Sequence, residues 1–324
     1  MMACYVGIDA GGTGTRVAVW EYPNGPWQYS MDGPPASLSS VSVEEVYRTV
    51  SGEALKLLGK RAPATVIGVG VAGCVSEEDR RGIAEHLVQA GVARRATVHH
   101  DAFTAWMGAT APSLDGIIVI AGTGSSIFGR KGEGMEVLVG GYGWRFGDEG
   151  SGSDLGRAAL RAAAAEEDGF GPVSTLRSRI LGYLGRTSMR QVMVDARDRD
   201  ADWLAEFAPL LLAAVTAGDV VAYQILTDRL NGLVEQIATA MRRVSEEPSA
   251  HIPVYGAGGL FSSPVYGEAI HRVGVGRLGP TFHIGQAKRH PWQGALLSAL
   301  AADGISLATA VRSGPMEATA CTPE

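Results

Sequence analysis

The sequence has few cysteines and no excess of basic residues. Three cysteines occur among its 324 residues, at Cys4, Cys74 and Cys321, without the paired spacing of a metal site. Any disulfide scheme would leave one thiol over, so we expect all three to be reduced. Lys and Arg together number 28 against 34 Asp and Glu, which gives a net charge of −6. This balance argues against general binding to nucleic acids or to anionic membranes.

Long apolar runs are also missing. No uninterrupted apolar stretch is long enough to cross a bilayer, and the first residues lack the basic region and apolar core of a secretion signal. We therefore expect a cytoplasmic protein without a membrane partner. Hydrophobic residues make up 46% of the chain, which argues against a disordered protein, and the length allows two domains.

A glycine-rich turn stands between two strand-like segments near the start, where residues 5–20 read YVGIDAGGTGTRVAVW. Glycines let backbone N–H groups approach an anion closely, hydroxyls add hydrogen bonds, and a carboxylate at a strand end can hold Mg²⁺. A Walker loop is excluded, because no Gly-Lys-Ser/Thr follows and residues 16–19 alternate like a strand. The turn predicts a phosphate-binding hairpin, although an ordinary glycine hairpin has a similar pattern. The predicted phosphate-binding residues are Gly11, Gly12, Thr13, Gly14 and Thr15, with Asp9 as the magnesium ligand.

A second hairpin of the same kind occurs at residues 116–129, which read GIIVIAGTGSSIFG. Two such hairpins in one chain predict two related lobes that face one nucleotide. A third glycine turn, VYGAGGLF at 254–261, follows a short strand-like segment, and a flat base or ribose could lie against its backbone. The further nucleotide-binding residues predicted are Gly122, Thr123, Gly124 and Ser125 in the second hairpin, and Gly256, Gly258 and Gly259 in the third turn.

Strand-like and helical segments alternate along the chain, which predicts an α/β fold. The last residues, 312–324, have no apolar period and are expected to form a loose tail. Strands are expected at 66–72 and 97–100, and helices at 43–58, at 77–90 with Ser76 as the cap, at 153–165, through 203–244 with breaks near Pro209 and Gly218, and at 292–302.

These motifs, in this order, resemble the superfamily of sugar kinases, heat-shock proteins and actin. Within it the chain is similar to N-acetylglucosamine kinases, which share the BadF/BadG/BcrA/BcrD ATPase family with activators of 2-hydroxyacyl-CoA dehydratases and benzoyl-CoA reductases. Each motif alone is weak, whereas their ordered succession over most of the chain is specific. The segments that carry the resemblance are GIDAGGT at 7–13, HDA at 100–102, AGTGS at 121–125, GGYGW at 140–144 with GDEGS at 147–151, and GAGG at 256–259.

The resemblance implies a two-lobed, actin-like (ribonuclease H-like) ATPase fold with the nucleotide in the cleft between the lobes. The first lobe would comprise residues 1–114 and about 286–311, and the second lobe residues 115–285. The resemblance also implies ATP as co-substrate, Mg²⁺ as cofactor, a small sugar as substrate and a homodimer as the assembly.

Asp101 follows a strand-like segment and precedes a helical one. From the residues alone it is either the cap of that helix or a catalytic group. The matching aspartate of hexosamine kinases is the general base, so the resemblance implies that Asp101 accepts the proton of the attacking sugar hydroxyl. The neighbouring His99 and His100 would point to opposite faces of a strand, so we do not expect them to share a metal ion.

The resemblance makes residues 140–152 a sugar-binding loop. Gly141 belongs to it, Tyr142 stands where relatives carry a tryptophan, and Asp148 would accept hydrogen bonds from sugar hydroxyls. Relatives also carry an asparagine after the first hairpin, where this chain reads GPPASLSS at 33–40. Ser37 or Ser39 would replace that asparagine, and a hydroxyl cannot duplicate both hydrogen-bonding groups of an amide. The sugar therefore stays open among glucosamine, N-acetylglucosamine, N-acetylmuramate and a plain hexose.

The favoured interpretation is ATP-dependent phosphorylation of a hexosamine, N-acetylglucosamine or glucosamine, at the 6-hydroxyl. One alternative is an ATPase activator of a reductase or dehydratase, but such relatives hold an iron–sulfur cluster with cysteines, and the three cysteines here do not match that pattern. The other alternative is a non-catalytic sugar sensor, for which the sequence lacks the cysteine-rich zinc motif of the related repressors.

Overall fold

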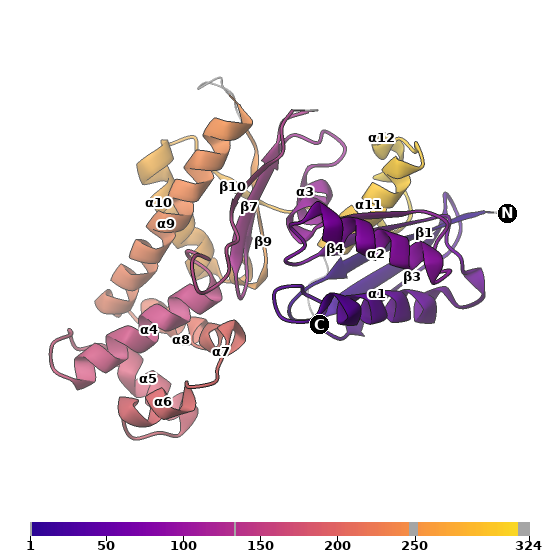
Figure 1. Ribbon diagram of the computed structural model, residues 1–324. Coiled ribbons are helices and arrows are strands. Elements are labelled where there is room, and N and C mark those ends of the chain that lie inside the picture. Colours follow the sequence, from indigo (N-terminus) through magenta and orange to yellow (C-terminus); the bar gives the residue numbers. More distant parts are fainter. Residues whose placement is uncertain (1, 133, 246–251, 317–324) are drawn as a thin grey trace. The chain divides into compact units, whose positions relative to one another are not determined.

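The computed structural model describes residues 2–132, 134–245 and 252–316, and within them the chain forms two compact units (Figure 1). Each unit is built on a five-stranded sheet with helices, so the α/β class expected from the sequence is confirmed. The division falls at Ile118, inside a strand, where the sequence places it at Leu114. Unit 1 takes in residues up to 118, 130–133 and from 286 onward, and unit 2 takes in 119–129 and 134–285.

The sheet of unit 1 has the strand order β3-β2-β1-β4-β5. β1 is antiparallel to β2 and parallel to β4, and β4 is parallel to β5. The carboxyl ends of three parallel strands therefore meet at one edge of the sheet, and two of the predicted site residues, Asp9 and Asp101, lie at those ends. The strands are β1 (Ala3–Ala10), β2 (Thr15–Tyr22), β3 (Trp27–Gly33), β4 (Val66–Val71) and β5 (Ala96–His100).

Helices cover both faces of this sheet (Figure 1). The first two, α1 (Val43–Leu58) and α2 (Glu77–Gln89), pack on one face, and each begins as the sequence predicts, with a serine side chain accepting a backbone N–H in the first turn. The other face carries α3 (Asp101–Thr110) and α11 (Pro291–Ala302), which contact each other. The helix α11 comes from the end of the chain, so residues nearly 300 positions apart share one core.

Two glycines let α11 lie directly on the sheet. A Cβ added to Gly7 would stand 2.5 Å from the carbonyl oxygen of Trp292, and one added to Gly68 would stand 2.0 Å from that of Ala295. Both distances are far below van der Waals contact, so any side chain there would push the helix away. This close contact keeps α11 and α3 in place beside the strand ends.

The segment after α11 packs on unit 1 over the part that the structure describes. A short helix α12 (Leu307–Ala310) and a 3₁₀ turn η3 (Gly314–Met316) follow, Pro315 and Met316 are buried, and the Gln293 side chain donates to the Pro315 carbonyl over 2.6 Å. The expectation of a loose tail from residue 312 is therefore wrong up to 316, because two apolar side chains there find a core to enter. Residues 317–324, including Cys321, lie outside the described residues.

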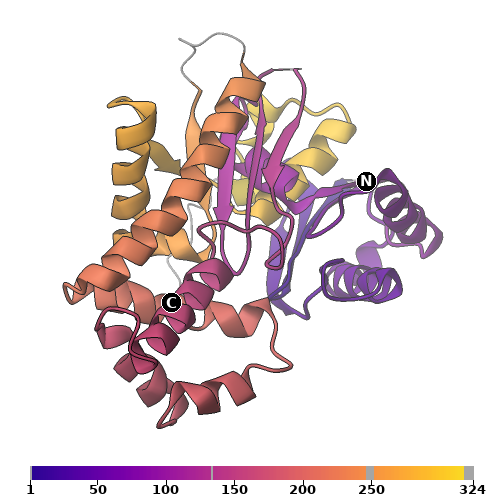
Figure 2. The same ribbon diagram turned by 60° about the vertical axis from the view of Figure 1, so that its left-hand side comes forward.

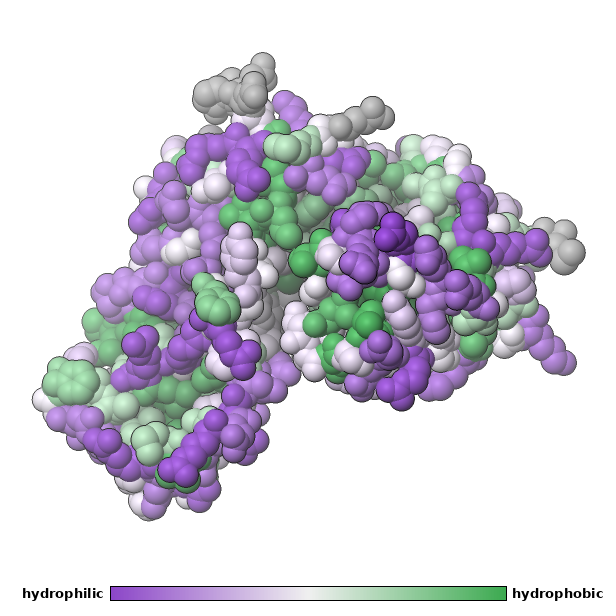
Figure 3. Space-filling view, in the orientation of Figure 1, coloured by the Kyte–Doolittle hydropathy of each residue, from purple (hydrophilic) through white to green (hydrophobic). Residues whose placement is uncertain are grey.

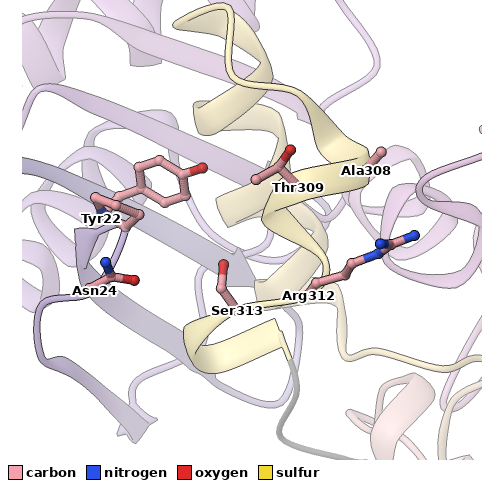
Figure 4. Close-up of a pocket in the computed structure, with 7 residues that line it drawn as sticks. Tyr22, Asn24, Ala308, Thr309, Arg312 and Ser313 are labelled. Atoms are coloured by element: carbon pink, nitrogen blue, oxygen red, sulfur yellow. The ribbon is translucent and has the colours of Figure 1, made fainter.

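This packing forms a pocket of about 460 Å³ against the β2–β3 turn (Figure 4). The predicted site residues do not contribute to its lining, so the pocket follows from the course of the chain end and is separate from the predicted chemistry. Its lining residues are Tyr22, Pro23, Asn24, Ala308, Thr309, Arg312 and Ser313.

The sheet of unit 2 has the order β10-β9-β6-β7-β8. If β6 to β10 are counted as the first to fifth strands and the sheet is read from its β8 edge, the order is 3-2-1-4-5. The sheet of unit 1 has the same order. The repeated hairpin seen in the sequence is thus part of a repeated sheet topology. The strands are β6 (Gly116–Ala121), β7 (Ser125–Arg130), β8 (Val137–Gly140), β9 (Val254–Ala257) and β10 (Ile284–Gln286).

The helices of unit 2 include the longest of the chain, α9 (Val220–Val244), which packs against β8 and α10 (Figure 2). Pro209 lies in the first turn of α8 and Gly218 precedes α9, so the breaks expected near both residues are confirmed. The surface over α4–α6 mixes hydrophilic and hydrophobic side chains (Figure 3). The other helices are α4 (Gly152–Glu167), α5 (Thr175–Leu184), α6 (Met189–Asp195), α7 (Ala201–Ala205), α8 (Ala208–Thr216) and α10 (Pro264–Leu278), with 3₁₀ turns η1 (Gly59–Arg61) in unit 1 and η2 (Gly259–Ser262) in unit 2.

Candidate functional site

The first predicted phosphate hairpin joins β1 and β2 in unit 1. The Gly11 N–H donates to the Gly14 carbonyl over 3.0 Å, which closes the turn, and Gly12 and Thr13 are exposed at its tip. Thr15 is buried, and its hydroxyl donates to the Pro34 carbonyl over 2.6 Å. The tip can therefore offer backbone amides and the Thr13 hydroxyl to a ligand, whereas the Thr15 hydroxyl holds the hairpin against the following segment.

Asp9 is buried at the end of β1 and pairs across the hairpin with Arg16, whose Nη1 lies 3.4 Å from Oδ2. Burial raises the pKa of the Asp9 carboxyl to about 6. The Arg16 guanidinium opposes this rise, and the nearby Asp101 carboxylate adds to it. The negative charge on Asp9 is thus only partly compensated within the protein, which is the environment in which a cation would bind.

Asp101 is the first residue of α3, and the cap of that helix is His100. Asp101 is therefore not at the cap position, although its carboxylate also accepts a backbone N–H of the first turn. The Asp101 Oδ1 lies 2.8 Å from Nδ1 of His100 and accepts the Ala102 N–H over 2.9 Å. About a quarter of the Asp101 side chain, 26%, is exposed. This leaves the carboxylate reachable by a ligand while one of its oxygens is held by its neighbours.

The histidine before this pair is part of the packing. The His99 ring stacks on Phe103 with centroids 4.1 Å apart, and burial lowers the pKa of its imidazole to about 4. Neutral His99 therefore stabilises the start of α3 against the sheet. Among the described residues there is no group of three or more His, Cys, Asp or Glu side chains that could hold a metal ion.

The two serines that could replace the asparagine of relatives differ in their surroundings. The Ser37 hydroxyl is buried, donates to the Ala72 carbonyl over 3.3 Å and accepts the Ser39 N–H over 3.2 Å. Ser39 is exposed. The Ser37 hydroxyl is thus occupied inside unit 1, so of the two hydroxyls that of Ser39 is the more accessible to a sugar.

The second predicted hairpin, between β6 and β7 of unit 2, is braced by Asp148. The Asp148 carboxylate accepts the backbone N–H groups of Ser125 and Gly143, and an added Cβ on Gly124 would stand 2.7 Å from its Oδ2. Burial raises the pKa of the Asp148 carboxyl, and these two N–H groups oppose that rise. The Ser125 hydroxyl in turn donates to the Glu149 carbonyl over 2.9 Å. The hairpin and the 140–150 loop are therefore one hydrogen-bonded body.

The rest of the 140–150 loop presents aromatic and basic side chains. Tyr142 is 78% exposed, and Trp144 carries the Arg145 guanidinium over its ring, 4.5 Å from the centroid. Arg157 of α4 also lies over this ring and donates to the Trp144 carbonyl. The loop is thus anchored to α4, while Tyr142 stands free at its surface.

The third glycine turn joins the second hairpin within unit 2. Gly258 has φ +99°, and an added Cβ would stand 2.4 Å from the carbonyl oxygen of Ala121, the last residue of β6. Gly256 is buried, whereas Gly258 and Gly259 are exposed. The structure therefore brings together, in unit 2, the predicted residues of the second hairpin, the third turn and the loop that holds Gly141, Tyr142 and Asp148.

The sequence interpretation missed two side chains next to the predicted ones. Arg16 pairs with Asp9, and the signal was present, because a turn at 11–14 places residues 9 and 16 opposite each other on the two strands. His100 contacts Asp101, whereas the sequence interpretation gives His100 itself no role beyond its place in the HDA segment. Its place directly before the first residue of a helix is the signal that could have identified it.

None of the described helices has the length and apolar content needed to cross a membrane. The chain is similar to known proteins over most of its length. A sequence model of the BadF/BadG/BcrA/BcrD ATPase family matches residues 6–299. An N-acetylmuramic acid/N-acetylglucosamine kinase from Clostridium acetobutylicum is 29% identical over 272 residues, which cover 82% of this chain and 88% of that protein. An N-acetyl-D-glucosamine kinase from Dictyostelium discoideum is 26% identical over 271 residues, which cover 79% and 84%.

Among solved structures, a protein from Chromobacterium violaceum that is provisionally called an N-acetylglucosamine kinase superposes with a TM-score of 0.71. It is 25% identical, and the match covers 91% of this chain and 98% of that one. A glucokinase of the ROK family from Streptomyces griseus, 16% identical, superposes with a TM-score of 0.58 over 92% of this chain and 99% of that one, a likeness of fold. These matches span both units, and the two-lobed fold of sugar kinases that the sequence predicts is confirmed.

Proposed function

Because the chain belongs to the BadF/BadG/BcrA/BcrD ATPase family, we propose that it is a kinase that transfers the γ-phosphoryl group of ATP to the 6-hydroxyl of a hexosamine, N-acetylglucosamine or glucosamine. The observation that carries the proposal is that both curated relatives described above are named as kinases of N-acetylated amino sugars and match about four fifths of this chain. The family match also includes both hairpins, Asp101 and the 140–150 loop.

In this proposal Asp101 is the general base. Its carboxylate is partly exposed, and of its two oxygens Oδ1 is held by neighbouring groups. The other oxygen would accept the proton of the sugar hydroxyl as that hydroxyl attacks the γ-phosphorus. A positioned carboxylate base typically contributes about 10²- to 10⁴-fold to a rate.

The two hairpins would hold the phosphates of ATP. Exposed amides at Gly12 and Thr13, and the turn at 122–124, are the groups available for this, while Thr15 and Ser125 keep their hydroxyls inside the hairpins. The buried and incompletely compensated charge of Asp9 fits a divalent cation held by one carboxylate, water and phosphate oxygens, the usual coordination of Mg²⁺ with ATP. A bound Mg²⁺ would neutralise charge that develops on the phosphates.

The sugar would bind at the 140–150 loop of unit 2. Asp148 already accepts two backbone N–H groups, and a carboxylate has further lone pairs with which to accept a sugar hydroxyl. Tyr142 would lie against the sugar ring, and Ser39, the exposed one of the two serines, would replace the asparagine of relatives. A homodimer remains a prediction.

The activator alternative receives no support from the cysteines that the structure describes. Cys4 and Cys74 are both buried, and burial raises the pKa of each thiol to about 11. Neither thiol belongs to a group of His, Cys, Asp or Glu side chains, among the described residues, that could hold a metal.

The test is direct detection of sugar phosphate. The protein is incubated with Mg²⁺ and ATP and with glucosamine, N-acetylglucosamine, N-acetylmuramate, N-acetylmannosamine or glucose, and products are identified by mass spectrometry. We expect a 6-phosphate of one hexosamine. Absence of every sugar phosphate from a preparation that binds ATP would contradict the kinase proposal.

The Asp101→Asn variant tests the proposed base. We expect turnover to fall by about 10²- to 10⁴-fold while ATP binding is retained. The matched control is Asp198→Asn, which removes an exposed carboxylate elsewhere and should behave as the wild type. Normal turnover by Asp101→Asn would show that the base is another group.

A further inference from the structure

The imidazole of His100 lies at the junction of β5 and α3, next to the proposed base. His100 has an extended backbone, with φ −61° and ψ 144°, and it precedes the first residue of the helix. Its side chain is 14% exposed, against 26% for the Asp101 side chain that it contacts. His99, on the opposite face of the strand, is already used in packing on Phe103.

The contacts of His100 bear on which nitrogen carries the proton. Its Nδ1 lies 2.8 Å from Oδ1 of Asp101, and the Ala102 N–H points at it over 3.1 Å. A neutral ring nitrogen is either a donor or an acceptor. If Nδ1 were the acceptor, its lone pair would face a carboxylate oxygen at 2.8 Å, which is repulsive. As a donor, Nδ1–H makes a hydrogen bond of ordinary length to the carboxylate.

The donor form also leaves the helix start paired. The Ala102 N–H then gives up Nδ1 of His100, which it faces at 3.1 Å, and keeps its second and closer acceptor, Oδ1 of Asp101, at 2.9 Å. Oδ1 then receives two N–H groups, one from His100 and one from Ala102. Among the described residues no hydrogen bond to Oδ2 of Asp101 is formed, so this oxygen is the one left for a ligand.

We infer that His100 is a positioning residue for Asp101: its Nδ1–H holds Oδ1 and so presents Oδ2 to the hydroxyl that is to be phosphorylated. The role in the reaction rests on the proposed function, in which Asp101 is the general base. The hydrogen bond itself does not, and it can be tested separately. Holding a base in one orientation matters because a displacement of about 1 Å at a reacting group can cost about 100-fold in rate.

The first experiment determines the tautomer by NMR. Long-range ¹H–¹⁵N correlation spectra of the protein, which has seven histidines, are compared with those of His100→Asn to assign the His100 ring. We expect a protonated Nδ1 in the wild type and a change of that signal in Asp101→Ala. A ring protonated only at Nε2 in the wild type would overturn the inference, whatever the protein catalyses.

The second experiment measures turnover. His100→Asn keeps a good helix cap, since asparagine is among the preferred cap residues, but removes the imidazole. We expect kcat to fall by about ten- to 100-fold with little change in KM for sugar or ATP, and an unchanged melting temperature. His86→Asn, on α2, is the matched control and should keep the wild-type kcat.

Each outcome separates the two proposals. Two results would show that His100 does not act through Asp101. One is a wild-type kcat in His100→Asn. The other is that His100→Asn lowers kcat by the same factor in Asp101→Asn as in the wild type. If the wild type phosphorylates no sugar, the proposed function fails and the NMR result alone decides the hydrogen bond.

Discussion

Replacing Asp9 by asparagine should stabilise the unloaded protein at neutral pH. Asp9 is 7% exposed, its partner Arg16 stands 3.4 Å away, and burial raises the pKa of its carboxyl from 3.8 to about 6. The folded state therefore holds a proton on Asp9 over a range of about two pH units in which the unfolded state has lost it. Since each unit is worth about 1.4 kcal/mol, the ionised carboxylate costs the folded state up to about 3 kcal/mol.

The sign of the pH dependence follows from this. The favourable contribution of protonated Asp9 is fully present below pH 4 and is lost as the pH rises through about 6. Asp9→Asn stays neutral throughout, so wild type and variant should be equally stable below pH 4. Above pH 6 the variant should be more stable by up to about 3 kcal/mol.

Urea unfolding in buffers without Mg²⁺, followed by tryptophan fluorescence from pH 4 to pH 8, measures this difference. Asp198→Asn, an exposed position, is the control and should track the wild type. A stability difference between Asp9→Asn and wild type that does not change with pH would refute the assignment of the cost to the buried charge.

Ligand should offset most of this difference in stability. A ligand at 100 times its Kd stabilises the folded state by about 2.7 kcal/mol. If Asp9 serves Mg²⁺, addition of Mg²⁺ and ATP should raise the wild type's urea midpoint far more than that of Asp9→Asn. Equal gains in the two proteins would exclude Asp9 from the metal site.

Two further predictions concern packing and hydrogen bonding. Asp148→Asn keeps a residue type that tolerates the φ of +64° but accepts one N–H group fewer, and loss of the bond to the buried Ser125 N–H would cost about 1–3 kcal/mol. Hydrogen exchange in peptides covering 121–129 should therefore become faster, and an unchanged rate would contradict the brace. Gly68→Ala would place a Cβ 2.0 Å from the Ala295 carbonyl oxygen and should cost about 1–3 kcal/mol by displacing α11. Gly52→Ala is its control, because the space around that position in α1 is open and the change should stabilise the helix by about 0.5–1 kcal/mol; a similar gain in Gly68→Ala would refute the close contact.

The elements that the sequence predicted best are those specified by neighbouring residues. Helix α1 occupies the expected range Val43–Leu58, and the expected Ser76 cap begins α2. Both glycine turns lie between antiparallel or adjacent strands, as their alternating flanks indicate. In each case the signal is a period or a cap within one stretch of chain, and such local interactions do not depend on the rest of the fold.

The predictions that failed or stayed open concern contacts between distant segments. The Ser37 hydroxyl donates to the Ala72 carbonyl. Residues up to 316 pack on unit 1 because Gln293 donates to the Pro315 carbonyl and because the core accommodates their apolar side chains. Asp148 accepts the backbone N–H groups of Ser125 and Gly143, and every residue except proline carries such a group. No residue type in the sequence marks such partners.

By itself, the sequence determined the α/β class, the two glycine hairpins, the order of the motifs and the position of Asp101 at a strand-to-helix junction, because periodicity, glycine content and chain order are local properties. Only the tertiary structure decided which polar groups remain available for chemistry. In the folded protein the hydroxyls of Thr15, Ser37 and Ser125 donate hydrogen bonds to backbone carbonyls. Arg16 lies beside Asp9, and His100 contacts Asp101. The physical reason is that a side chain's availability depends on what folding brings next to it, and a buried donor or acceptor takes whichever partner the packing provides.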